Sequence, residues 1–269
     1  MRSPLSWLVV AACLAISTPA FAGRSFYGWL YDSDVMPERG AELQTWLLER
    51  DDFGSNNEHE TTMWLGALVG ITDQLELALP VEFDWTDADM QGADFTLRRY
   101  GVELRYRLVP PDGKDTSAAP APAAGDFGLA PPPPPRHHAF VPLIRVAAKR
   151  DVVVRGAAIL EADLVMTYQT GRLHADLDLG AVATIAPTDE GGSHFQARPG
   201  AGVSIRATGE LRFGAELYGE LDVDDSNVRW LAIGPNMAWT HGRFWLSAAL
   251  GIGITGIDWA PRTMWGVAF

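Results

Sequence analysis

Hydrophobic and polar residues alternate with a period of two along most of the chain. In residues 74–84 the odd positions carry leucine, valine or phenylalanine, and the even positions include Glu76, Glu82 and Asp84. Side chains alternate across a β-strand, so such a segment has one apolar and one polar face. We therefore predict an all-β protein. The same rhythm returns in residues 100–108, 173–185 and 211–223.

Twelve segments of this kind can be counted, and their length indicates where they fold. Most contain 10–14 residues. Strands of soluble proteins average about 5–6 residues, whereas a tilted strand that crosses a bilayer needs about 9–11. The pattern predicts a transmembrane antiparallel up-and-down β-barrel of about 12 strands. The segments are 38–50, 58–71, 74–84, 95–108, 140–149, 157–169, 172–185, 195–207, 210–223, 228–239, 243–255 and 261–269.

The connections alternate between tight turns and longer polar loops. Outer-membrane barrels have short periplasmic turns and longer outer loops. If both chain ends lie in the periplasm, every tight turn falls on the periplasmic side. The tight turns are residues 72–74, 170–172, 208–209 and 241–242, and the longer loops are residues 51–57, 85–94, 187–194 and 223–227.

One periplasmic connection, residues 110–138, departs from this rule because it is long and rich in proline and alanine. The run Pro131 to Pro135 predicts a short polyproline II rod, and the rest is expected to be disordered. We interpret the segment as a tolerated insertion, with peptide binding as the alternative.

The first 22 residues have the pattern of a secretory signal peptide. Arg2 precedes an apolar run, and Ala20 and Ala22 form a small-x-small cleavage site. A lipoprotein site at Cys13 is the alternative, but it fits less well because apolar residues would begin the mature chain. The expected domains are thus the signal peptide (1–22), an N-terminal segment (23–37) and the barrel (38–269) with its insertion.

The segment 23–37 is rich in aromatic residues, among them Phe26, Tyr27, Trp29 and Tyr31. Such a segment is expected to pack against other residues. We predict that it plugs the periplasmic mouth of the barrel or packs against its rim.

Composition narrows the remaining choices. The formal net charge is −13, which gives no reason to expect a nucleic-acid partner. Cys13 is the only cysteine, so neither a disulfide framework nor a thiol metal site is expected. We predict no cofactor and no metal site. His137-His138 is a weak metal signal without further ligands, and His59 and His174 are interpreted as isolated lumen or rim residues.

Charged residues of the polar faces come in blocks of opposite sign. Acidic residues dominate the first three segments and arginines the next two, so neighbouring strands would place opposite charges side by side. All basic residues except Lys114 and Lys149 are arginines, whose forked guanidinium suits carboxylate pairing. The predicted lumen-lining residues are Glu42, Glu60, Glu76, Glu82, Glu103, Arg105, Arg107, Arg145, Lys149, Glu161, Asp163, Asp176, Asp178, Arg198, Arg206, Arg212, Glu216 and Glu220.

Two functions follow from such a lumen. A 12-strand barrel is wider than an eight-strand barrel that its own side chains fill, so it can hold a narrow path for small solutes. Alternatively, paired charges or the N-terminal segment close the lumen, and the barrel serves a structural or adhesion role. The expected partners are outer-membrane lipid, the outer-membrane assembly machinery and a small-molecule solute.

Two competing classes remain. A secreted β-sandwich also alternates, but its strands would be shorter and it would not place rings at strand ends, as Tyr106, Phe140, Tyr168, Trp239, Phe244 and Phe269 are placed. A lipid-modifying hydrolase would need a serine beside a base, and Ser193-His194 is the nearest candidate. Adjacent Ser-His in a glycine-rich loop is typical of a turn, so we predict no catalytic residues and no enzyme.

Two stretches resemble a known group of outer-membrane barrels. Residues 64–77, with Gly70-Ile71-Thr72-Asp73-Gln74-Leu75-Glu76-Leu77, and residues 101–108 are similar to a hairpin and strand of the phenol-degradation-pathway, MetA-like transporters and related porin-like proteins. The resemblance covers the first four segments and implies a passive outer-membrane channel for small solutes, including hydrophobic or aromatic compounds. The ending Trp265, Val267, Phe269 resembles the C-terminal strand that the assembly machinery reads in such barrels.

Overall fold

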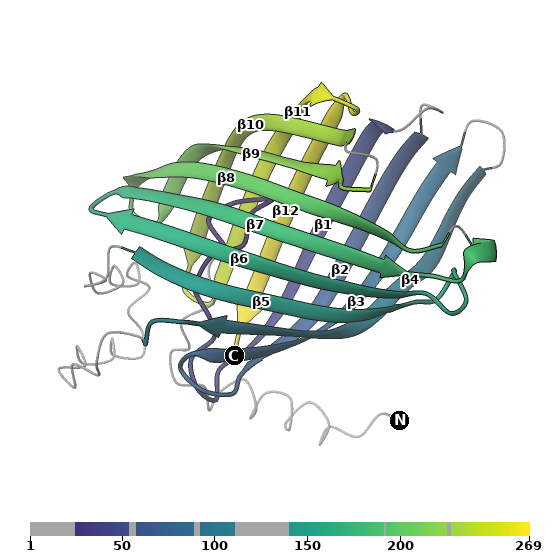
Figure 1. Ribbon diagram of the computed structural model, residues 1–269. Helices are drawn as coiled ribbons and strands as arrows, with labels where there is room; N and C mark the ends of the chain where they lie inside the picture. Colours follow the sequence, from purple (N-terminus) through teal and green to yellow (C-terminus); the bar gives the residue numbers. More distant parts are fainter. Residues whose placement is uncertain (1–24, 54–57, 89–91, 111–139, 191, 225–226) are drawn as a thin grey trace, which may run out of the picture.

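Twelve antiparallel strands close into a single barrel in the computed structural model (Figure 1). The structure describes residues 25–269 except 54–57, 89–91, 111–139, 191 and 225–226. The strands are β1 (Ala41–Phe53), β2 (Glu58–Gly70), β3 (Leu75–Ala88), β4 (Gly92–Arg107), β5 (Phe140–Asp151), β6 (Ala158–Thr170), β7 (Leu173–Ile185), β8 (His194–Thr208), β9 (Leu211–Asp222), β10 (Asn227–His241), β11 (Phe244–Thr255) and β12 (Trp259–Ala268), with a short 3-10 helix η1 (Thr188–Glu190) before β8.

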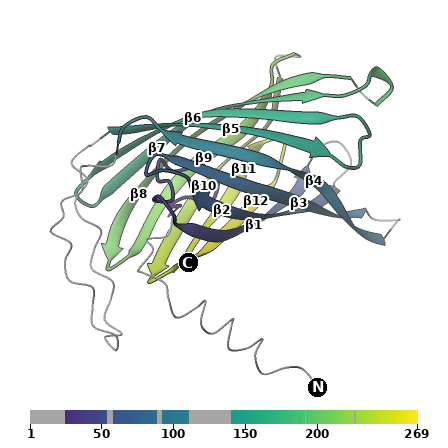
Figure 2. The same ribbon diagram turned by 90° about the horizontal axis from the view of Figure 1, so that it is seen from below.

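Each strand pairs with its neighbours in sequence, and β1 pairs with β12 to close the barrel. The closing ladder runs from Glu42 opposite Ala268 to Asp51 opposite Trp259. Because the ladder is closed, no sheet edge is left over, which is the condition for a β-structure to stand in a bilayer. The view in Figure 2 shows the same closed wall from below. The predicted fold class is confirmed.

The two faces of the wall differ as the alternation predicts. Along β5, buried and exposed residues alternate, with Arg145 and Lys149 buried and Ile144 and Val146 exposed. The outside is apolar over most strands, and leucine, isoleucine, valine and aromatic side chains are exposed on it. This outer belt is the surface that lipid would cover. No helix in the described part of the chain is long and apolar enough to span a membrane.

The tight turns all lie at one end of the barrel, which we call the tight-turn rim. Gly171, Gly209 and Gly242 take φ values of 54°, 52° and 59°, a left-handed backbone that glycine adopts without a steric penalty. The opposite end, the long-loop rim, carries η1. Five of the six predicted girdle aromatics are exposed, and Phe244 is half-buried.

The first strand begins three residues later than the sequence predicted. The amide of Gly40 donates a hydrogen bond to the carbonyl of Pro37 at 2.8 Å, and Arg39 has a φ of 67°. A turn therefore occupies residues 37–40, and β1 starts at Ala41. The predicted signal peptide, its alternative site at Cys13 and nearly all of the proline-rich insertion lie outside the described residues.

A charge on the outer belt should destabilise the barrel according to its depth. Leu164 stands at the middle of β6 and faces outward, whereas Thr170 ends the same strand at the rim. We expect Leu164→Arg to lower the free energy of unfolding in lipid vesicles by about 2–4 kcal/mol and Thr170→Arg by about 0–1 kcal/mol. Urea titration of the folded barrel measures both, and equal costs would contradict a lipid-covered belt.

Candidate functional site

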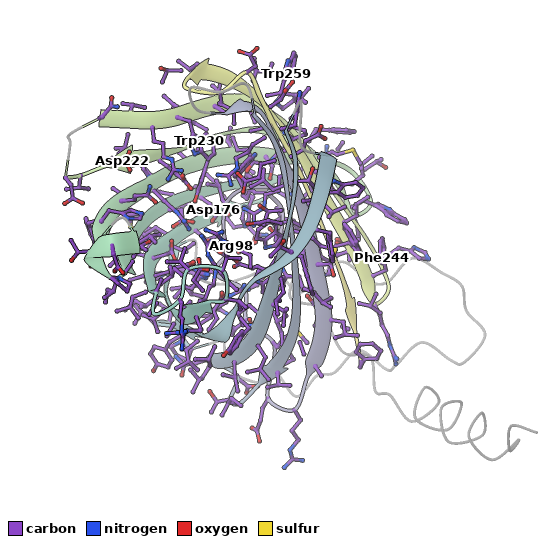
Figure 3. All side chains as sticks on the ribbon, turned by 90° about the vertical axis from the view of Figure 1, so that its right-hand side faces the viewer. Arg98, Asp176, Asp222, Trp230, Phe244 and Trp259 are labelled. Carbon is purple, nitrogen blue, oxygen red and sulfur yellow. The ribbon has the colours of Figure 1, made fainter. Side chains whose placement is uncertain are left out.

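The candidate site is the interior of the barrel, where the predicted lumen-lining residues lie. All of them are buried on the inner face except Glu60, Arg198 and Arg206, which are half-buried. In the end-on view of Figure 3, side chains fill the interior, with Asp176 and Trp230 on the inner side of the wall and Phe244 and Trp259 on the outer side.

Strand register brings charges from β3 to β6 into one row. Glu76 lies opposite Arg105, Arg105 opposite Arg145, and Arg145 opposite Asp163. Two arginines are thus neighbours, and Glu103 lies between them: it accepts from Arg105 Nε at 2.7 Å and from Arg145 Nη2 at 2.6 Å. The carboxylate bridges the two guanidinium groups and balances their repulsion.

Arg145 is the centre of this row. Its guanidinium contacts three carboxylates, those of Glu103 at 2.6 Å, Glu161 at 2.8 Å and Asp163 at 2.5 Å, and its side chain is 1% exposed. A buried ion costs several kcal/mol in lost hydration unless such partners surround it. The arginine and its three carboxylates therefore compensate one another for the hydration that each loses on burial.

A second cluster lies further along the same strands, toward the long-loop rim. Lys149 Nζ donates to Glu82 at 2.6 Å and to Glu161 at 2.7 Å. Glu161 thus links Lys149 to Arg145. Arg99 also contacts Glu82, at 3.4 Å. The basic and acidic residues of these strands form one connected network.

The opposite wall is less charged and contains residues that the sequence analysis did not single out. Trp230, Trp245 and Met264 are buried on the inner faces of β10, β11 and β12. Each is an even number of residues from a buried polar residue of its strand and therefore points to the same face, as Trp230 does with Thr240 in β10 and Trp245 with Ser247 in β11. Large apolar residues on an inner face indicate that something packs against them, and this signal was present in the sequence.

The N-terminal plug, residues 25–40, is what packs there. It enters near the tight-turn rim, where Phe26 contacts His174 and Arg212. Trp29 contacts Trp230 and Ala260, which lie near the long-loop ends of β10 and β12. The plug then returns to the tight-turn rim, where the amide of Glu38 donates to Asp73 at 3.1 Å. The purple trace inside the barrel in Figure 1 shows this excursion.

Carboxylates and hydroxyls of the wall bind the backbone of the plug. The amides of Gly28 and Trp29 both donate to Glu216, each at 2.8 Å, and the amide of Met36 donates to Glu76 at 2.7 Å. These buried amides have no strand partner, so the wall must supply their acceptors. The amide of Tyr31 also donates to Asp178 at 3.5 Å, so three of the predicted lumen carboxylates hold the plug.

Aromatic side chains of the plug complete the contact. The Tyr31 ring lies 4.3 Å from the guanidinium carbon of Arg145 and 5.3 Å from that of Arg105, so it sits on the central charged row. Burial raises the pKa of Tyr31 to about 12, and the phenol therefore stays neutral at physiological pH. Trp29 stacks on Tyr218 at 5.1 Å between ring centres.

Two glycines of β8 make room for the plug. A β-carbon at Gly200 or Gly202 would collide with Leu30, and one at Gly202 also with Tyr27. The plug is thus fitted to this part of the wall.

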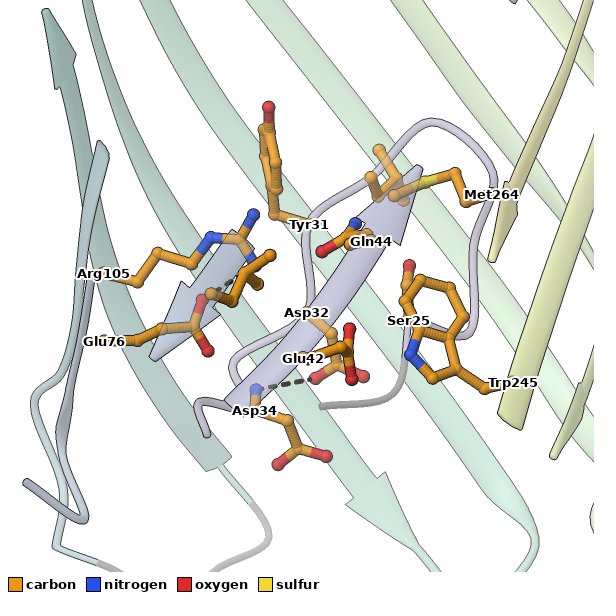
Figure 4. A pocket seen from close by; sticks show the side chains of 12 residues that line it. Ser25, Tyr31, Asp32, Asp34, Glu42, Gln44, Glu76, Arg105, Trp245 and Met264 are labelled. Carbon is orange, nitrogen blue, oxygen red and sulfur yellow. Dashed lines mark hydrogen bonds and ion pairs between the residues drawn. The ribbon is translucent and has the colours of Figure 1, made fainter. Parts of the chain in front are cut away.

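A small cavity remains between the plug and the wall (Figure 4). Its volume is about 20 Å³, and Tyr31, Asp32 and Asp34 line it on the plug side. That volume holds about one water molecule. Glu42, Glu76 and Arg105 line the wall side.

The prediction that His59 and His174 are isolated is wrong. His59 Nδ1 lies 2.6 Å from Asp51 at the long-loop rim. His174 is fully buried between Asp32 and Asp176. The contact with Asp32 joins residues that are far apart in the sequence, so strand periodicity alone could not reveal it.

Ser193 and His194 are both exposed just before and at the start of β8. Both lie at the long-loop rim. The prediction that they have no catalytic role stays a prediction.

Comparisons with known proteins identify the fold. No protein-family model matches the sequence, and no curated protein matches it either. The COG4313 outer membrane channel from Pseudomonas putida F1 has a similar structure, with a TM-score of 0.55 and 11% identity over 89% of this chain and 99% of that one. The KdgM porin in complex with disordered oligogalacturonate (TM-score 0.46, 9% identity, 86% and 98% covered) and the NanC porin (0.47, 9%, 85% and 98%) align less well.

The chain therefore has the fold of a Gram-negative outer-membrane barrel. The closed ladder, the long strands and the apolar outer belt are the features that a bilayer requires of a β-structure. Together with the shared fold, they place the protein in the outer membrane.

Removal of Arg145 should destabilise the barrel strongly. Arg145→Met leaves Glu103, Glu161 and Asp163 as a buried group of carboxylates with one cation fewer, and we expect a loss of about 3–5 kcal/mol in the free energy of unfolding. Arg150→Met is the matched control, because Arg150 stands on the same strand and is exposed. Urea unfolding in vesicles measures both. Similar losses would mean that the network contributes little.

Proposed function

We propose that the protein is an outer-membrane channel for passive diffusion of small solutes, and that the N-terminal plug closes it. The observation that carries this proposal is a lumen lined with charge and filled by a segment that is not part of the wall. The similarity in fold to a described outer membrane channel supports it.

The manner of attachment supports a plug that can leave. Within residues 25–40 the structure contains neither a strand nor a helix. Backbone hydrogen bonds join Arg39 and Gly40 to Gly70 at the end of the segment. Before that point the wall contacts it through side chains such as Glu216, Glu76 and Arg145. Its departure would break none of the strand pairs that close the barrel. A closed wall with a separable occupant is the arrangement that a gated pore needs.

The lining favours cations. Among the buried side chains of the described strands, eleven are carboxylates and six are basic. Half-buried arginines of the inner face, such as Arg99, Arg198 and Arg206, reduce this excess, and the remainder would give an unplugged lumen a negative potential. The carboxylates are Glu42, Glu76, Glu82, Glu103, Asp151, Glu161, Asp163, Asp176, Asp178, Glu216 and Glu220, and the basic residues are Arg105, Arg107, Arg145, Lys149, Arg212 and Arg262.

For the solute class we propose small compounds, including hydrophobic or aromatic ones. The resemblance of residues 64–77 and 101–108 to the phenol-degradation-pathway, MetA-like transporters supports this choice. Aromatic side chains of the plug supply a second argument, because Trp29 occupies a pocket formed by Tyr218 and Trp230. A flat apolar solute would fit the same place when the plug is out.

A structural barrel is the second candidate. The pairing of Arg145, Lys149 and their carboxylates favours it, because paired charges can rigidify a wall without serving transport. The two candidates differ in whether replacing the plug opens a path for ions.

Replacement of the plug should open the channel. In planar bilayers we expect the wild-type barrel to be closed for most of the time, and a variant with residues 25–36 replaced by a Gly/Ser linker of equal length to give discrete, larger openings. The matched control replaces the exposed Glu38 and Arg39 with serine and should stay closed. A linker variant that is folded by heat-modifiability yet does not conduct would contradict the channel and favour the structural barrel.

Selectivity should follow the wall carboxylates. In the linker variant, the reversal potential in a salt gradient is expected to show preference for cations. Glu42→Gln and Glu216→Gln together should shift it toward zero, because both residues are buried on the inner face. Glu49→Gln, an exposed position on β1, is the control. Anion preference in the starting variant would disprove the proposed electrostatics.

A further inference from the structure

Three potential metal ligands meet where the plug touches β7. Asp32 comes from the plug, and His174 and Asp176 come from the inner face of the strand. All three side chains are buried, and one ligand atom of each lies within 4.8 Å of the others. One imidazole and two carboxylates form a donor set typical of divalent transition-metal sites.

The distances fit coordination better than direct hydrogen bonding. His174 Nε2 lies 3.5 Å from Asp32 Oδ2, and His174 Nδ1 lies 3.4 Å from Asp176 Oδ2. Strong N–H···O hydrogen bonds span about 2.7–3.2 Å. Zinc bonds of about 2.0–2.2 Å in a tetrahedron separate neighbouring ligand atoms by about 3.3–3.6 Å, so each carboxylate lies at ligand spacing from the ring nitrogen that it flanks.

The two carboxylates flank opposite nitrogens of the ring, so one of them must rotate toward the nitrogen that binds the ion. Asp32 is suited to this because it also lines the cavity of about 20 Å³ between plug and wall. That cavity has room for about one water molecule, which would approach the ion from the side of Asp32, because neither His174 nor Asp176 lines the cavity.

The surroundings hold the histidine in place. The Tyr27 hydroxyl donates to the carbonyl of His174 at 3.0 Å and lies 3.3 Å from its Nδ1, and the Phe26 ring packs against the imidazole with 4.7 Å between ring centres. Groups around a metal ligand that fix its ring orientation are a regular part of such sites. The two carboxylates bring two negative charges into one buried place near Arg212, and a divalent cation would add further positive charge there.

We propose that Asp32, His174 and Asp176 bind a divalent transition-metal ion of the Zn²⁺ type. Since one ligand belongs to the plug and two belong to the wall, the bound ion would stabilise the plugged state. This consequence for gating rests on the proposed channel function, whereas the site itself does not.

Metal titration of the folded full-length barrel in detergent tests the site. Co²⁺ serves as the probe because its visible absorption reports coordination, and Zn²⁺ is titrated by calorimetry. We expect one equivalent per barrel, and at least tenfold weaker binding in Asp32→Asn and in His174→Gln. Asp32→Asn keeps the size of the side chain and lies outside the wall, so the barrel should fold. It keeps the test valid if His174→Gln does not fold.

Three control variants test whether the metal binds at this place. Asp34→Asn removes a neighbouring acid of the plug, and His59→Gln removes the other histidine that contacts a carboxylate. Both variants should bind Co²⁺ as the wild type does. His137 and His138 lie outside the described residues, and their replacement by glutamine should also leave one equivalent bound.

Either of two results would overturn the site: no stoichiometric binding by the wild type, or binding that survives Asp32→Asn and disappears when His137 and His138 are replaced. Conductance is read separately. If the metal binds as expected while the linker variant does not conduct, the site stands and the channel fails. If the channel opens on plug replacement but the wild type binds no metal, the channel function stands and the metal site is disproved.

Discussion

The closed ladder of backbone hydrogen bonds is the constraint on which this structure depends. In lipid, every amide and carbonyl of the wall must find its partner within the protein, and pairing of β1 with β12 meets that demand. Once the ladder is closed, side chains can point only outward or inward. The outward set must be apolar, so the charged residues are gathered inside, where each needs a counter-charge. The network around Arg145 and the binding of the plug by Glu216 are consequences of this confinement.

Much of the fold could be predicted from the sequence because a period of two is a local property. The alternation in β5 or β7 assigns each residue to a face without knowledge of its neighbours. Strand number, the tight turns and the inward position of Arg145 and Glu103 follow from it. The start of β1 was missed because a turn at residues 37–40 interrupts a stretch that still alternates.

The interior was predictable in composition but not in connectivity. Residues 25–40 have no periodicity, so the sequence indicated that they would pack but not that Gly28 and Trp29 would share Glu216. The meeting of Asp32 with His174 likewise depends on the path of the plug. Trp230 and Trp245 could have been recognised, since they occupy inner-face positions where a water-filled lumen would not favour large apolar rings.

The plug enters and leaves at the same rim, and this shape has a mechanical consequence. Tension applied to its N-terminal end from the tight-turn side would load its contacts one after another, beginning with Phe26 and passing to Gly28 and Trp29. Peeling of this kind needs a far smaller force than shearing all the contacts at once. A push from the long-loop side would instead meet the whole excursion together. The occupant of this barrel is therefore easier to extract from one face of the membrane than from the other.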